Sequence, residues 1–266
     1  MSIRYQEYPP PIDLRSWVQC FWTYEASAIG PRSHRVLPDG CIDILFEVTA
    51  RRAYDGYVVG MMTGPLLVAR SEPSHTSAVR FKPGGAAAFF REPLYRLTNA
   101  RIDLCELWPR PAALLEQLAA AETAGERMDI LVGELRRRLA VPPRGHAGCR
   151  HAVWRLACEP ETGVRELCAE LGVSRQALAR SFREHVGIPP KTLARVLRLQ
   201  RALGLLARPG GDRPLPWVDL ALAAGFYDQS HMIGEWKDLV GLTPIAFLAE
   251  SGGKVPFFQD SDSRPE

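Results

Sequence analysis

Two stretches of this sequence share one layout, and that repetition limits the folds open to the chain more than any other feature. Each stretch begins with a glycine, continues through a short polar turn into an amphipathic segment, and ends in a Gly-x-x-Pro turn. The stretches are GVSRQALARSFREHVGIPP, residues 172–190, and GFYDQSHMIGEWKDLVGLTP, residues 225–244. A glycine that ends one helix and a capped start of the next predict a helix pair at each place.

The first pair has the pattern of a helix-turn-helix motif. Apolar residues at helical spacing precede the glycine: Val164, Leu167, Cys168 and Leu171. Gly172 can adopt the left-handed conformation that ends a helix, and Ser174 is a suitable N-cap for the next one. Leu178 and Phe182 are then expected to face inward. The outward positions are polar or small, as a helix that enters the DNA major groove requires: Arg175, Gln176, Ala179, Arg180 and Arg183.

The second pair repeats this plan. The first helix is expected to contain Val218, Leu220, Ala221 and Ala224, and to end at Gly225. Asp228 is expected to cap the next helix. The positions expected to face inward are Met232, Trp236 and Val240, and those left near the exposed start of the helix are Gln229, Ser230, His231 and Ile233. Residues 193–206 fit between the two pairs as a long connecting helix.

The tandem arrangement resembles the C-terminal domain of the AraC/XylS family of bacterial transcription regulators. The segments ELGVSRQALARSFREHVGIPP and ALAAGFYDQSHMIGEWKDLVGLTP carry this resemblance, which covers residues 148–248. It implies two recognition helices that read successive major-groove segments of double-stranded DNA. Carried over residue by residue, the reading positions are Gln176, Ala179 and Arg180 in the first helix and Gln229, Ser230, His231, Ile233 and Gly234 in the second.

The two recognition helices differ in charge and in one family position. Gly234 stands where the family usually has arginine, and a glycine offers no base contact and weakens a helix. Between residues 175 and 201 seven basic residues face one acid, Glu184, whereas acids outnumber basic residues between 212 and 250. Clustered basic charge is typical of a surface that binds a polyanion. We therefore expect an asymmetric reader, in which the first helix supplies most of the affinity.

The N-terminal part of the chain has the short runs of β-branched and apolar residues that are typical of strands. Such runs are IDILFEV at 42–48, LLVAR at 66–70 and SAVRF at 77–81. The stretches SHRVLPDGCIDILFEV and VRFKPGGAAAFF resemble a poorly characterised sensor-type domain that is fused to AraC-type DNA-binding domains. The fold class expected is therefore α+β, with a β-rich, cupin-like N-terminal domain followed by an all-α domain with two helix-turn-helix motifs.

This N-terminal domain is expected to bind a small-molecule effector or to form a homodimer. Trp17, Phe21 and Trp22 either line a pocket or belong to the core. Asp43 and Arg80 each interrupt an apolar run, so they either form a buried ion pair or orient a polar ligand.

The pattern predicts four segments along the chain. A β-rich domain at 1–110 is followed by a helical connector and linker at 111–145, with the sequence VPPRG at 141–145 breaking any helix. The tandem helix-turn-helix domain occupies 146–250. A tail at 251–266 contains the apolar island VPFF, for which docking on the body and disorder both stay open.

Other functions have less support in the sequence. The six cysteines form no C-x-x-C pair, the six histidines have no metal-binding spacing, and no nucleophile or phosphate-loop motif is present. We expect no catalytic residues, metal or cofactor, and a cytoplasmic protein with no membrane segment. RNA polymerase is a further candidate partner. The alternatives are a DNA-repair methyl-acceptor protein, which needs an activated cysteine, and an architectural DNA binder without an effector.

Overall fold

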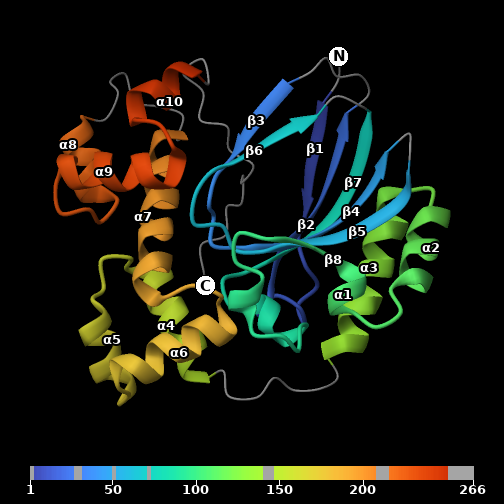
Figure 1. Cartoon of the computed structure of the whole chain (residues 1–266), viewed down its shortest axis with the longest axis horizontal. Coiled ribbons are helices and arrows are strands. Elements are labelled where there is room, and N and C mark those ends of the chain that lie inside the picture. The colour runs from blue at the N-terminus through green and yellow to red at the C-terminus, as the bar shows by residue number, and fades with distance from the viewer. Residues whose placement is uncertain are drawn as a thin grey trace.

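The computed structural model describes residues 3–26, 32–49, 52–70, 73–139, 147–207 and 216–250. All strands of the described chain lie before residue 104, and the part from residue 147 onward is built of helices (Figure 1). The α+β fold class predicted from the sequence is therefore confirmed. The linker at 141–145 and the tail at 251–266 lie outside the described residues.

The N-terminal part contains two antiparallel sheets. The larger one has the order β1-β2-β7-β4-β5-β8. Its strands are β1 (Ile3–Tyr8), β2 (Val18–Ala26), β4 (Ile42–Thr49), β5 (Arg52–Val59), β7 (Ser74–Phe81) and β8 (Arg101–Asp103). The smaller sheet pairs β3 (Arg32–Val36) with β6 (Leu66–Arg70). The N-terminal domain is therefore β-rich, as predicted, with one sheet of six strands and one of two. Its likeness to a cupin stays a prediction.

The two faces of the large sheet have different neighbours because side chains alternate along each strand. Ile42, Ile44 and Phe46 of β4 are buried in a core that helical residues complete. The helical segments that follow the strands are η1 (Gly85–Ala88), η2 (Leu94–Arg96), α1 (Leu104–Leu107), α2 (Ala112–Ala120) and α3 (Ala124–Leu139). Helix α2 packs against β5 and α3 against β7, so the predicted connector helices cover the sheet (Figure 1).

The opposite face carries the polar pair that the sequence predicted. Asp43 of β4 and Arg80 of β7 are cross-strand partners in register. The Nε and Nη2 atoms of Arg80 lie 3.2 and 3.1 Å from the two carboxylate oxygens of Asp43, so the predicted ion pair is confirmed. Of the three aromatic residues considered, Phe21 and Trp17 pack with the helical core, whereas Trp22 lies on the face with Asp43.

The C-terminal domain places two helix pairs around one long helix. The helices are α4 (Ala147–Cys158), α5 (Val164–Leu171), α6 (Arg175–His185), α7 (Pro190–Ala207), α8 (Trp217–Ala223), α9 (Gln229–Val240) and α10 (Pro244–Glu250). The central helix α7 contacts α4 and α6 toward its beginning and α8 and α9 toward its end, as Figure 1 shows. It is the connecting helix predicted from residues 193–206. No helix of the described part is long and apolar enough to cross a membrane.

Candidate nucleic-acid interface

The first helix-turn-helix forms as the sequence predicts. Gly172 ends α5 with a φ of 66°, in the left-handed region that favours glycine. Ser174 caps α6, because its side-chain oxygen accepts a hydrogen bond from the backbone N–H of Ala177 at 3.1 Å. Leu178 and Phe182 are buried. These contacts fix which face of α6 turns away from the protein.

The N-terminal half of α6 presents the polar side chains to solvent. Arg175, Gln176 and Arg180 are exposed, and Ala179 is half-buried. The side chain of Arg180 is 82% exposed, and its Nε lies 3.1 Å from a carboxylate oxygen of Glu184 one turn later. An exposed pair of this kind contributes only about 0.3–0.5 kcal/mol, so Arg180 can exchange it for a base or phosphate contact. The arrangement suits a recognition helix that reads bases with its first turns.

The C-terminal half of α6 rests on the N-terminal domain instead. The Arg183 guanidinium lies 5.0 Å from the centre of the Tyr95 ring in η2. Just after the helix, the Gly187 carbonyl accepts a hydrogen bond from the Thr98 hydroxyl at 2.9 Å. Arg183, which the sequence placed on the outward, DNA-binding face of this helix, lies beside Tyr95 of the N-terminal domain, and its contact with DNA stays a prediction.

The second helix-turn-helix also forms as predicted. Asp228 caps α9, because its carboxylate accepts a hydrogen bond from the backbone N–H of His231 at 2.7 Å. The predicted inward residues, Met232, Trp236 and Val240, are fully buried. Gly225 has a φ of 86°. The two units therefore share one backbone design.

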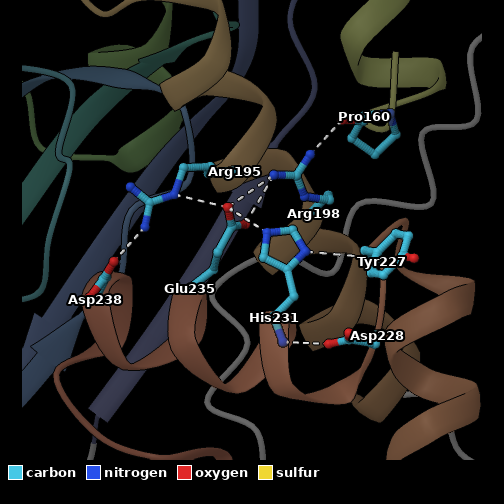
Figure 2. A network of polar contacts seen from close by, with 8 residues as sticks. All are labelled: Pro160, Arg195, Arg198, Tyr227, Asp228, His231, Glu235 and Asp238. Carbon is cyan, nitrogen blue, oxygen red and sulfur yellow. Dashed lines mark hydrogen bonds and ion pairs between the residues drawn. The ribbon is translucent and has the colours of Figure 1, made fainter. Parts of the chain in front are cut away.

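A buried carboxylate joins α9 to the connecting helix. Figure 2 shows Glu235 of α9 surrounded by three basic side chains. Its carboxylate oxygens lie 3.2 Å from Arg195 Nε, 3.0 Å from Arg198 Nη2 and 3.2 Å from His231 Nε2. Only 9% of Glu235 is exposed. Arg198 also donates to the Pro160 carbonyl at 3.0 Å, so the network reaches from α9 through α7 to the loop after α4.

This network uses both ring nitrogens of His231. Nδ1 accepts a hydrogen bond from the backbone N–H of Tyr227 at 3.3 Å, which leaves the proton on Nε2 for Glu235 (Figure 2). His231 was predicted to read bases, but neither nitrogen is free in this arrangement. Of the other predicted readers in α9, Ser230 is exposed, whereas Gln229 and Ile233 are half-buried.

The basic cluster of the sequence does not form one positive surface. Arg195 and Arg198 are turned toward Glu235, and Arg195 also donates to Asp238 at 2.7 Å. Arg201 lies 3.7 Å from Glu161. The count along the chain was therefore a poor guide, because the arginines of α7 are paired with carboxylates that come from distant parts of the sequence.

Two exposed residues were missed as candidates for DNA contact. Tyr227 is 86% exposed at the turn just before α9. Lys237 is exposed one turn after Ile233. An aromatic residue between buried Phe226 and the capping Asp228, and a lysine at helical spacing from Ile233, were the available signals. Both side chains can donate to phosphate oxygens.

Comparisons with known proteins agree with this architecture. A family model described as a helix-turn-helix domain matches residues 167–250, and one described as a domain of unknown function (DUF6597) matches residues 6–103. The fold and the two exposed helix starts define a tandem helix-turn-helix DNA-binding domain joined to a β-rich domain. The C-terminal domain of this chain is an AraC-type helix-turn-helix domain.

Individual proteins that resemble this chain have low sequence identity to it. The HTH-type transcriptional regulator MtrA of Neisseria gonorrhoeae is 28% identical over 96 residues, which are 36% of this chain and 31% of that protein. The match thus spans about a third of the relative's own length. Among solved structures, ToxT from Vibrio cholerae O395 aligns at 12% identity with a TM-score of 0.43, covering 86% of this chain and 97% of ToxT. ToxT in a complex with an unsaturated fatty acid aligns at 11% identity with a TM-score of 0.41, covering 93% and 94%.

Proposed function

We propose that the protein is a sequence-specific DNA-binding regulator of transcription, controlled through its N-terminal domain. The observation that carries the proposal is the pair of capped helices, α6 and α9, which start at exposed turns on either side of α7. Arg175, Gln176 and Arg180 supply donors that suit guanine and adenine edges. Such a protein acts where the DNA is, in the cytoplasm. A homodimer and a contact with RNA polymerase stay predictions.

The two units are proposed to contribute unequally. The exposed start of α6 carries two arginines and a glutamine, whereas in α9 His231 is held by Glu235 and Gly234 has no side chain. The second unit is then expected to add phosphate contacts, through residues such as Lys237 and Tyr227, more than base contacts.

Replacing Arg180 with alanine is expected to weaken binding to a selected DNA site by about 1–3 kcal/mol and to relax the base preference at one position. His231→Ala is expected to cost less in DNA affinity, since His231 already bonds within the protein. A fluorescence anisotropy titration of both variants at one salt concentration measures the difference. A larger loss for His231→Ala would contradict the asymmetry.

The alternative of a DNA-repair methyl acceptor needs a cysteine whose thiol has a lowered pKa. The buried thiols of Cys20 and Cys149 have raised pKa values instead. Burial raises the pKa of Cys20 to about 12 and that of Cys149 to about 11. A raised pKa keeps the thiol protonated and unreactive at neutral pH. Among the described residues no group of side chains could hold a metal ion. The alternative of an architectural DNA binder is tested by the ratio of specific to non-specific affinity, which would be near one.

A further inference from the structure

A cleft lies between the two helix-turn-helix units. Its volume is about 320 Å³, and it is bordered by the loop before α5, by the first half of α7 and by His231 and Glu235 of α9. Each unit therefore contributes one wall, and α7 lies between them. Two recognition helices that enter successive major-groove segments leave a stretch of DNA backbone between them. Because the cleft separates the units that carry these helices, it lies where that stretch of backbone crosses the protein.

One wall of the cleft is the start of α5. Thr162, Gly163 and Val164 border the cleft there. Gly163 is the N-cap of α5, and no side chain caps this helix. The N–H groups of a first helical turn have no partner inside the helix, and together with the helix dipole they favour an anion. Glu166, the acid in this turn, does not border the cleft and lies 3.4 Å from Arg155 of α4.

Thr162 supplies an independent sign of a ligand. Only 8% of this residue is exposed, and it borders the cleft. Its hydroxyl makes no hydrogen bond with any other group of the described residues. A buried hydroxyl without a partner is unfavourable, so a ligand that accepts its hydrogen bond is stabilising. Threonine hydroxyls and helix N-termini are both common donors to DNA phosphates.

Lys191 brings a positive charge to the cleft from the start of α7. Its side chain is exposed, borders the cleft and forms no ion pair within the described part of the chain. A cation in the first turn of a helix opposes the helix dipole. The stability of α7 therefore does not explain a lysine at this position, whereas an anion in the cleft does.

The two carboxylates on the cleft wall are already paired. Glu235 lies 3.2 Å from Arg195 and 3.0 Å from Arg198, as Figure 2 shows. Glu161 lies 3.7 Å from Arg201. Each carboxylate thus has its own arginine partner from α7. Lys191 is a further positive charge, beyond those that the carboxylates hold.

We propose that this cleft holds one phosphate group of the DNA backbone, in the stretch between the two half-sites. Its donors are the Lys191 ammonium, the Thr162 hydroxyl and the N–H groups at the start of α5. A phosphate contact carries no base information, so it sets the register of the two recognition helices on the duplex and not the sequence that each one reads. The inference rests on the proposed function and deepens it, because it assigns a DNA contact to the segment between the two readers.

Lys191→Gln tests the charge. In anisotropy titrations of the full-length protein on its selected duplex, the slope of log affinity against log salt is expected to become shallower by about 0.9, the value for one phosphate. Near physiological salt the affinity is expected to fall about three- to ten-fold, with the selected motif unchanged. Arg137→Gln is the control, because it removes an exposed charge from α3 in the N-terminal domain and is expected to leave the slope unchanged. An unchanged slope in Lys191→Gln overturns the proposal.

Thr162→Val separates a phosphate contact from a structural role. Valine has nearly the same shape as threonine but lacks the hydroxyl. The variant is expected to bind the selected duplex about three-fold more weakly, while its Tm stays the same or rises because an unpaired buried hydroxyl is removed. A lower Tm, or an unchanged DNA affinity, contradicts the role assigned to this hydroxyl.

A single neutral linkage in the DNA locates the contact. Methylphosphonates replace the phosphates between the half-sites one at a time. At one position the unsubstituted protein is expected to lose about three- to ten-fold in affinity, whereas Lys191→Gln loses less than about two-fold there, because its contact is already gone. Equal losses for both proteins at every position overturn the proposal but leave the proposed function standing. Failure of the unsubstituted protein to bind any duplex contradicts both.

Discussion

Replacing Glu235 with glutamine is expected to lower the free energy of unfolding by about 3 kcal/mol. The carboxylate is buried and contacts Arg195, Arg198 and His231, as Figure 2 shows. Glutamine keeps nearly the same shape but leaves the two arginines without their shared negative partner. Removing one member of a buried charge pair costs more than the pair contributes, because the remaining charge stays desolvated. Chemical denaturation followed by circular dichroism measures the change.

Asp238→Asn is the matched control for this substitution. Asp238 also bonds to Arg195, at 2.7 Å, but its side chain is 68% exposed. Its loss is expected to cost less than about 1 kcal/mol, because water screens an exposed pair. Equal costs for Glu235→Gln and Asp238→Asn would show that the Glu235 network contributes little to the domain.

The Glu235 network is also expected to matter for DNA binding. It ties α9 to α7, and through Arg198 to the Pro160 carbonyl beside the first helix pair. It therefore helps to set the relative orientation of the two recognition helices. Two rigidly joined readers bind a pair of half-sites more tightly than two loosely joined ones, because less freedom is lost on binding.

Replacing Gly234 with arginine is expected to create a base contact in the second half-site. No atom lies within 4 Å of a Cβ placed on Gly234, so a side chain can be added there without a clash. An arginine that reaches guanine contributes about 1–3 kcal/mol, or roughly 5- to 150-fold in affinity. Selection from random duplexes with the variant is expected to enrich a guanine that the unsubstituted protein does not require. Titration on the newly selected site then measures the gain.

Gly234→Ala separates this contact from the effect on the helix. Alanine removes the cost of a glycine inside a helix, about 1 kcal/mol, without adding a polar group. It is expected to raise thermal stability and to leave base preference unchanged. If the alanine and arginine variants select the same site with the same affinity, position 234 does not face DNA.

Local sequence patterns were sufficient to predict the two helix-turn-helix pairs. Glycine at 172 and 225 and the caps at Ser174 and Asp228 each depend on residues a few positions away, and each was predicted correctly. The strands β4, β6 and β7 were also predicted, since each contains a short run of mostly apolar or β-branched residues. Strands such as β1, IRYQEY, and β5, RAYDGYVV, alternate with charged residues or contain glycine, so their pattern was too weak.

Contacts between distant segments were harder to predict. The sequence shows seven basic residues near the first recognition helix, but not that Arg195 and Arg198 turn toward Glu235, some 40 positions away. His231 was predicted to read bases because it lies near the start of the second recognition helix. Its ring bonds to Glu235 one turn later, and the sequence does not show that Glu235 is turned inward at that place. A cavity between the two sheets is lined by residues of all eight strands, β1 to β8, and of α7, so it could be found only once these elements were placed together. By contrast, the Asp43–Arg80 pair was predictable, since a charge inside an apolar strand needs a partner.

Selection of bound fragments from a random duplex library, followed by a salt-dependent titration on the enriched sequence, tests the central claim most directly. Two recognition helices on one chain predict a single motif with two unequal half-sites about one helical turn, roughly 10–10.5 base pairs, apart. The stronger half-site should lose its base preference in Arg180→Ala. Binding without any enriched motif, with a steep dependence on salt and equal affinity for all duplexes, would contradict the claim that this protein reads sequence.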